Sequence, residues 1–137
     1  MSSLIWVGGR GENIPTGWST TRPWRVYRKM SDMVDPGPSK TFVFLDERED
    51  TLNDGMFVVD MTGYPDQGSQ FNIVDIPGSY HNRAGGLSFA DGHSEIRKWR
   101  DSRTYPPYKP GVVTPYGIPS KDNPDVLWMQ EHATRVN

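Results

Sequence analysis

The chain of 137 residues has no cysteine, no long apolar run and almost no excess of charge of either sign. Without cysteine it has no disulfide framework, no thiolate nucleophile and no zinc site of the cysteine type. Nothing in it approaches the ~20 apolar residues that a helix needs to span a bilayer, and no apolar run of signal-peptide length follows Met1. The net charge of −2 gives no general attraction to nucleic acid or to anionic membranes. As given, the chain is expected to be soluble and to have no nucleic-acid partner.

Hydrophobic residues make up only 34% of the sequence, whereas 14 glycines and 12 prolines predict many loops and short elements. Five Trp, six Tyr and five Phe supply the large apolar side chains that a compact core needs. This length favours a single domain over residues 1–137. Within it, residues 1–24 are expected to form a Gly/Trp-rich loop and residues 104–122 a Pro/Tyr-rich loop.

The fold class expected from these features is α+β, a small antiparallel sheet of about four or five short strands with short helices and long Pro/Gly-rich loops. Apolar residues at helical spacing predict a short helix over Arg25–Val34, before Pro36. Asn123 as N-cap and Pro124 at the first helical position predict a C-terminal helix. The strands expected before the final hairpin are Thr41–Leu45, Met56–Met61 and Phe71–Ile76.

The stretch His81–Trp99 has the pattern of a β-hairpin. Asp91-Gly92 between two alternating segments predicts a two-residue turn, in which Ala90 faces His93 and Leu87 faces Ile96. In that register Leu87, Phe89 and Ile96 share the buried face of the hairpin. His93 and Glu95 then lie on the opposite face, beside the turn.

Ala84-Gly85-Gly86 is interpreted as a flexible link that folds His81 back toward the turn. A cluster of His81, Asp91 and His93 would result. Such a cluster has three possible roles: holding a transition metal, acid–base catalysis near neutral pH, or locking the loop through hydrogen bonds. Asp91 also has a purely conformational explanation, because the Asp-Gly turn requires it.

The segment from Asp46 to Gly55 contains five carboxylates and one arginine. Hard cations such as calcium bind several carboxylate and carbonyl oxygens on flexible loops, so a calcium site is one interpretation. The candidate metal ligands are Asp46, Glu47, Asp50, Asp54 and Asp91. The segment lacks the ligand spacing of an EF-hand, and a solvated acidic turn is the other interpretation.

The hairpin segment carries a family resemblance. His81, nine residues and then Asp91-Gly92 resemble the H-x9-DG signature of prepilin-like proteins of the type II secretion pseudopilin kind, found in Planctomycetes and Verrucomicrobia. The segments VYRKMSDMVDPGPSKTFVFLDERED, FVVDMTGYP and NPDVLWMQEHATR are also similar to the globular part of that family. The resemblance implies a pseudopilin-like domain with a calcium ion in one loop. In the family the full-length proteins face the periplasm from an inner-membrane anchor helix, which is not recognisable here.

Two functions follow from these observations. The first is a structural or assembly domain whose partners are other pseudopilin subunits or a second copy of itself. A sheet face left uncovered by the anchor helix would be apolar and exposed in that case. The second is a small calcium-dependent hydrolase of esters or lactones, for example N-acyl homoserine lactones, with His81, Asp91 and His93 as catalytic residues.

Overall fold

The structure is a computed structural model that describes residues 1–8, 24–115 and 117–136. The described elements follow one another as β1 (Ser2–Leu4), η2 (Met30–Asp32), β2 (Phe42–Leu45), β3 (Met56–Phe57), η3 (Gly68–Gln70), β4 (Asn72–Ile73), β5 (Ala84–Phe89), β6 (Ser94–Lys98), η4 (Ser102–Thr104), β7 (Ile118–Pro119) and α1 (Pro124–Glu131). The α+β class expected from the sequence is confirmed. Residues 9–23 of the predicted Gly/Trp-rich loop lie outside the described residues.

A five-stranded sheet has the order β3-β1-β2-β5-β6, and β4 and β7 form a separate two-stranded sheet. The larger sheet is mixed and not antiparallel throughout, because β3 runs parallel to β1. β1 lies inside the predicted N-terminal loop and was not expected as a strand. The predicted strand over Phe71–Ile76 shortens to β4 and pairs with β7, where Pro119 takes an edge position.

One face of the sheet supplies the core. Leu4, Leu45 and Leu87 are buried on it. A β-bulge in β2 changes which side chains face inward, because Phe42 pairs with Phe89 while Phe44 pairs with Ser88. Phe42 is therefore fully buried, whereas Phe44, two residues along, lies on the opposite face with 43% of its surface exposed.

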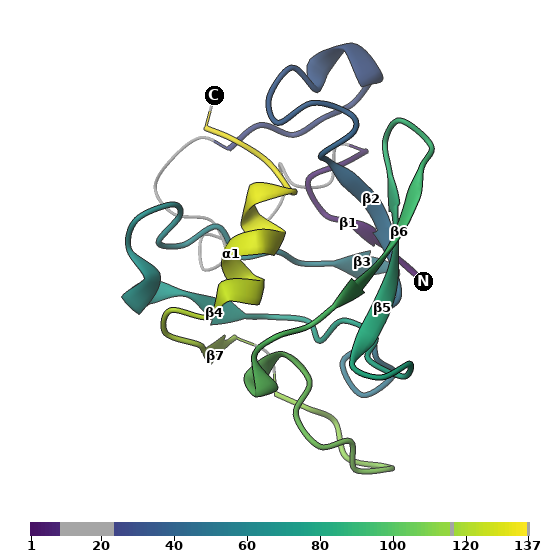
Figure 1. The fold of residues 1–137 in the computed structure, drawn as a ribbon, viewed down its shortest axis with the longest axis vertical. Helices are drawn as coiled ribbons and strands as arrows, with labels where there is room; N and C mark the ends of the chain where they lie inside the picture. The colour runs from purple at the N-terminus through teal and green to yellow at the C-terminus, as the bar shows by residue number, and fades with distance from the viewer. Residues whose placement is uncertain (9–23, 116, 137) are drawn as a thin grey trace.

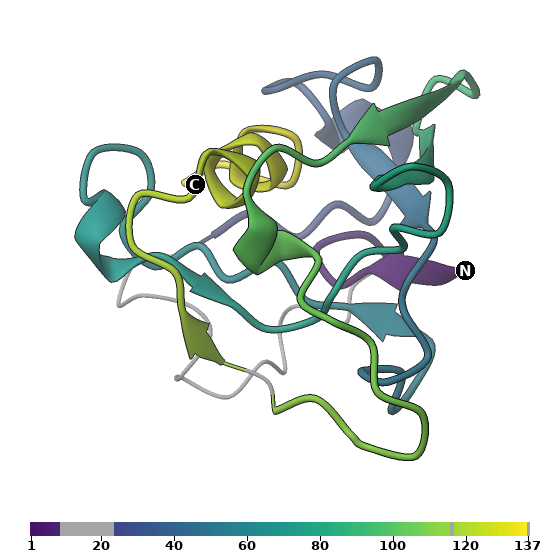
Figure 2. The ribbon, with the colours of Figure 1, turned by 60° about the horizontal axis from the view of Figure 1, so that its bottom comes forward.

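The helix α1 covers the core face of the sheet, as Figures 1 and 2 show. The prediction of this helix is confirmed, including its start. The Asn123 side chain caps it by accepting a hydrogen bond of 2.8 Å from the Asp125 N–H, and Pro124 occupies the first turn. The Trp128 ring stacks on Phe42 at a centroid distance of 6.5 Å, which packs the helix against β2.

The predicted helix over Arg25–Val34 is wrong, since only the 3-10 turn η2 forms in this segment. The preceding residues pair with the start of the chain: Tyr27 N–H donates to the Trp6 carbonyl at 2.9 Å, and Gly8 N–H donates to the Tyr27 carbonyl at 2.8 Å. These tertiary hydrogen bonds hold the backbone extended, so they override the helical spacing of the apolar residues. The strand predicted over Met56–Met61 is likewise limited to its first two residues, β3.

The glycines before the hairpin turn are part of β5 and do not form a hinge, so the predicted flexible link is wrong. Gly85 is required by close packing, because a Cβ atom at this position would lie 2.5 Å from the Gly78 carbonyl oxygen. At Gly86 a Cβ would lie 3.1 Å from Asp46 Oδ2, and the Gly86 carbonyl accepts a hydrogen bond from Asp46 N–H. Both glycines thus allow β5 to lie directly against a neighbouring backbone segment.

Candidate functional site

The tip of the β5–β6 hairpin has a register one residue away from the predicted one. Phe89 N–H donates to the His93 carbonyl at 2.8 Å, and Gly92 N–H donates to the Phe89 carbonyl at 3.0 Å. The loop therefore has three residues, with Gly92 in the left-handed region at φ +95°. This is the loop in which a type I turn is followed by a glycine bulge, and not the predicted two-residue turn.

The shift of one residue moves every side chain of β6 to the other face. Glu95 lies opposite Leu87, so Glu95 and His93 share the face that turns toward α1, contrary to the prediction. Ile96 lies opposite Gly86 on the uncovered face, where 82% of its surface is exposed. The prediction that Ile96 is buried is wrong for the same reason.

His93 lies between two carboxylates at the hairpin tip. Its Nδ1 is 2.5 Å from Asp91 Oδ1, and its Nε2 is 3.0 Å from Glu95 Oε1. These contacts, first with Glu95 and then with Asp91, raise the pKa of His93, and the contact with His93 lowers the pKa of Asp91. The pairing of Asp91 with His93 was predicted, whereas Glu95 was missed. With a carboxylate at each ring nitrogen, the surroundings of His93 favour its protonated form.

His81 does not reach this cluster, so the predicted return of His81 to the turn is wrong. It lies at the other end of β5, where Ala84 N–H donates to the His81 carbonyl and closes a turn through Asn82 and Arg83. Both turn residues have positive φ, 52° and 65°. The six residues of β5 separate this turn from Asp91 by about 20 Å of extended chain.

A series of aromatic ring contacts connects the hairpin tip to α1. The His93 ring stacks on Phe89 at 4.4 Å between centroids, and the edge of His132 contacts Phe89 at 6.3 Å. His132 in turn stacks on Trp128 at 4.1 Å between centroids, and the Arg97 guanidinium lies over the Trp128 ring, 4.4 Å from its centroid. Burial lowers the pKa of His132, so this ring is neutral near pH 7. From the sequence, His132 is expected to be a structural or surface residue of the C-terminal helical segment and not a ligand. Its contact with Phe89 depends on packing between α1 and the hairpin.

The arrangement at the tip predicts an elevated titration midpoint for His93. In an NMR titration that follows the C2 proton of the His93 ring, we expect the pKa of His93 to lie above the usual 6.5. We expect Glu95→Gln to lower this pKa, because Glu95 contributes most to raising it. A folded pKa above the unfolded one means that protonated His93 stabilises the fold fully below about pH 6.5, and that this contribution is lost as pH rises through the folded pKa. Glu131→Gln, an acid on α1, is the control and leaves the His93 midpoint unchanged. A midpoint at or below 6.5 in the unaltered protein contradicts the cluster.

The acidic segment after β2 does not behave as one loop, because its carboxylates point to different partners. Asp46 binds the backbone of β5, with Gly86 N–H donating to its Oδ2 at 3.3 Å. Asp50 makes a bidentate ion pair with Arg48, in which Nε donates to Oδ1 at 2.9 Å and one terminal nitrogen donates to Oδ2 at 2.6 Å. Asp54 accepts a hydrogen bond of 2.7 Å from Met56 N–H at the surface. These contacts make Asp46 and Asp50 parts of the fold.

Glu47 is buried like Asp50 but has no arginine partner among the described residues, and its hydrogen bond leads through Thr51 to a segment that the sequence reasoning did not connect with it. Thr51 Oγ1 donates to Glu47 Oε1 at 3.4 Å and accepts from Ile76 N–H at 3.2 Å. This link brings Glu47 toward Asp75, which is 3% exposed and accepts a 2.6 Å hydrogen bond from Val58 N–H. Burial is the main cause that raises the pKa of both carboxyls, that of Asp75 to about 7. No local sequence signal marks Asp75, since it lies in a segment predicted as an ordinary strand.

Among the described residues, no group of three or more His, Asp or Glu side chains is arranged to hold a metal ion. The five predicted ligands, Asp46, Glu47, Asp50, Asp54 and Asp91, therefore do not form a common centre in this structure.

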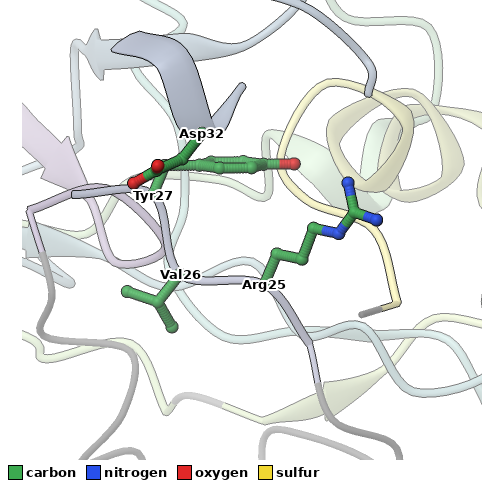
Figure 3. A pocket seen from close by; sticks show the side chains of 4 residues that line it. All are labelled: Arg25, Val26, Tyr27 and Asp32. Atoms are coloured by element: carbon green, nitrogen blue, oxygen red, sulfur yellow. The ribbon is translucent and has the colours of Figure 1, made fainter. Parts of the chain in front are cut away.

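A surface pocket of about 320 Å³ is lined by Arg25, Val26, Tyr27 and Asp32. Figure 3 shows the Arg25 side chain extending toward the C-terminal segment and the Tyr27 ring crossing the pocket. The Tyr27 hydroxyl donates to the Asp35 carbonyl at 2.6 Å, and the Asp32 carboxylate accepts from the Arg28 and Lys29 N–H groups. The Tyr27 hydroxyl and the Asp32 carboxylate thus serve the local fold, and no residue predicted as catalytic lines the pocket.

Comparison with protein-family models, with curated proteins and with solved structures found no match to this chain. In the part of the chain that the structure describes, no helix has both the length and the apolar character required to cross a bilayer.

Proposed function

We propose that this chain is a pseudopilin-like assembly domain, of the kind that type II secretion-type systems join into a pilus-like structure. The observation that carries the proposal is the uncovered face of the five-stranded sheet. The helix α1 lies on one side of the sheet, and the described chain places no helix on the other side (Figures 1 and 2). A domain built to pack against a neighbouring subunit needs such a face.

The uncovered face carries one row of residues across the five strands, namely Met56, Ser3, Phe44, Ser88 and Ser94. Ile96 projects from the same face, two residues further along β6. Small serines beside exposed Phe44 and Ile96 leave a surface onto which a partner can pack closely. The charged edge strand β6, with Glu95, Arg97 and Lys98, disfavours extension of the sheet at its edge. The uncovered face is therefore the proposed contact.

The resemblance of His81, Asp91 and Gly92 to the H-x9-DG signature supports the same role. In that role the domain would face the periplasm from the inner membrane, as in the family that it resembles. The alternative, a calcium-dependent ester or lactone hydrolase, requires His81 beside Asp91 and His93. It also requires a free imidazole nitrogen to accept a proton. The separation of His81 by β5 and the double pairing of His93 favour assembly over hydrolysis.

Light scattering coupled to size-exclusion chromatography tests this proposal. We expect the chain to self-associate in a concentration-dependent way, and we expect the double variant Phe44→Ser/Ile96→Glu to weaken association about tenfold or more, because it removes the apolar contacts and adds a charge. The matched control is Val113→Glu, which adds the same charge to an apolar residue that is 72% exposed elsewhere on the surface. A chain that stays monomeric at millimolar concentration, or a control that dissociates equally, contradicts the proposal.

A further inference from the structure

Another surface pocket, with a volume of about 280 Å³, lies where η3 meets the chain that leads into α1. Two backbone hydrogen bonds fasten these segments together: Asp122 N–H donates to the Gly68 carbonyl at 2.9 Å, and Ser120 N–H donates to the Phe71 carbonyl at 2.8 Å. None of the residues predicted as catalytic or as metal ligands lines this pocket. Its side chains are therefore available for a role that the candidate site does not cover.

The inner part of the pocket is apolar. Phe71 is 3% exposed and belongs to the hydrophobic core, and the half-buried Leu127 packs against that core from α1. Two exposed prolines complete the hydrocarbon surface, so that the apolar lining consists of Pro65, Phe71, Pro124 and Leu127. Such a lining favours the hydrocarbon part of a ligand, because contact with it removes apolar surface from water.

Two carboxylates, those of Asp66 and Asp122, line the same pocket. Within the described part of the chain, neither carboxylate has a hydrogen-bond or ion-pair partner, and no Lys, Arg or His lines the pocket. Arg103 interacts electrostatically with Asp122, but its guanidinium is engaged by Asp101 at 2.9 Å and 2.6 Å and by the Lys121 carbonyl at 2.9 Å. The pocket thus combines hydrocarbon surface with two negative charges that the described residues leave unpaired.

The Asp122 carboxylate has a fixed place beside η3. Asp122 has φ +54°, in the left-handed region that aspartate adopts more readily than most residues. In this conformation its Oδ1 lies directly over Gly68, where a Cβ atom would overlap it. The carboxylate therefore occupies this position only because residue 68 is a glycine. A charge that is already in place costs little ordering when a ligand binds.

We propose that this pocket binds a primary alkylammonium group, with the hydrocarbon chain on Phe71 and Leu127 and the ammonium at Asp66 and Asp122. An ammonium carries the required charge and three N–H donors for carboxylate oxygens. The apolar lining favours an organic cation over a metal ion, and the described residues add no third His, Asp or Glu to the pair. Ligand pockets commonly measure about 300 to 1,000 Å³, so this volume suits a short aliphatic amine. The inference is independent of the proposed assembly role.

A titration of the ¹⁵N-labelled full chain with 1,5-diaminopentane, followed by the backbone amide signals, tests the pocket. We expect the signals of Gly68, Asp122 and Leu127 to shift together, with a dissociation constant of about 1 mM or below. 1-Pentanol, which keeps the chain but lacks the charge, and ammonium chloride, which keeps the charge but lacks the chain, are expected to bind at least about tenfold more weakly. Nα-acetyl-lysine N-methylamide distinguishes the source of the amine. Binding as tight as that of diaminopentane indicates a lysine side chain, and weaker binding indicates a free amine.

Two kinds of variant test the assigned residues. Asp66→Asn/Asp122→Asn keeps the size of both exposed side chains and is expected to weaken diaminopentane binding at least about tenfold. Gly68→Ala keeps both charges but displaces the Asp122 carboxylate, and it is expected to weaken binding about threefold or more while the amide spectrum shows a folded chain. The matched control is Glu131→Gln, which removes an exposed charge from the other end of α1 and leaves the dissociation constant unchanged.

The pocket does not bind amines if diaminopentane at about 20 mM shifts none of its amide signals. Shifts that persist undiminished in Asp66→Asn/Asp122→Asn would overturn the assignment of the two carboxylates. An equal response to 1-pentanol would show that the pocket recognises only hydrocarbon, and an equal loss of binding in Glu131→Gln would show that only the overall charge of the chain matters. Either result contradicts the proposal.

Discussion

Replacement of Asp125 by alanine is expected to lower the free energy of unfolding by about 3 to 5 kcal/mol. The Asp125 side chain is fully buried in the first turn of α1. Its carboxylate accepts hydrogen bonds from the N–H groups of Arg100 (2.9 Å) and Asp101 (2.8 Å) and from Thr104 Oγ1 (2.9 Å). Alanine would leave the buried Thr104 hydroxyl and the two part-buried N–H groups without this acceptor, and a buried donor left unpaired costs about 1 to 3 kcal/mol.

Urea unfolding followed by tryptophan fluorescence measures this effect. Asn123→Ala, which removes only the N-cap of the same helix and its contacts, is expected to cost about 1 to 2 kcal/mol. Asp66→Ala, at an exposed site, is the control and is expected to change stability by less than about 0.5 kcal/mol. If Asp125→Ala costs no more than Asn123→Ala, the carboxylate is not what fastens the segment after β6 to the helix.

The parts of the fold that follow from short-range signals were predictable. α1 begins at Asn123-Pro124 because a capping side chain and a proline act within one turn of the chain. The segment Arg25–Val34 has equally clear helical spacing, but its first residues pair with Trp6 and Gly8. The local sequence contains no signal of a partner so distant along the chain, so the helix prediction was wrong there.

The hairpin register shows the same limit within a single motif. Asp91-Gly92 fits a two-residue turn and also a three-residue loop that ends in a left-handed glycine. A contact with the residue before β2 favours the three-residue loop. Ala90 N–H donates to the Thr41 carbonyl at 2.9 Å and is therefore not free to pair with His93. That single contact decides that Glu95 joins His93 and that Ile96 faces outward. The existence of the hairpin was predictable, whereas the identity of its exposed face was not.

The acidic segment shows that carboxylates close together in the sequence need not form one binding site in the fold. The sequence shows the carboxylates of Asp46, Glu47, Asp50 and Asp54 close together along the chain. Folding directs Asp46 to β5 and Asp50 to Arg48, and it brings Glu47 to Asp75 from a different segment. What distinguishes Glu47 is its burial without a counter-charge, a property of packing that spacing along the chain does not encode.

A second large effect is expected at the buried ion pair. Arg48→Met is expected to lower the free energy of unfolding by about 3 to 5 kcal/mol, because it leaves the Asp50 carboxylate buried without its counter-charge. Arg48 and Asp50 are 3% and 8% exposed. The guanidinium also donates to the Pro106 carbonyl, and Asp50 also accepts from the Thr114 hydroxyl, so the pair fastens the Pro/Tyr-rich loop to the core.

A double variant separates the loss of the pair from the penalty of a lone charge. Arg48→Met/Asp50→Leu is expected to recover most of the stability and to lie about 1 to 2 kcal/mol below the unaltered chain, since neither charge of the pair is left, while the Thr114 hydroxyl, the Pro106 carbonyl and the Tyr108 ring lose a partner. Arg103–Asp101 is the matched control, because its two contacts have the same lengths, 2.9 Å and 2.6 Å, but Arg103 is 46% exposed. Arg103→Met is expected to cost less than about 1 kcal/mol. Equal losses for Arg48→Met and Arg103→Met in urea unfolding would show that burial of the first pair has no energetic consequence.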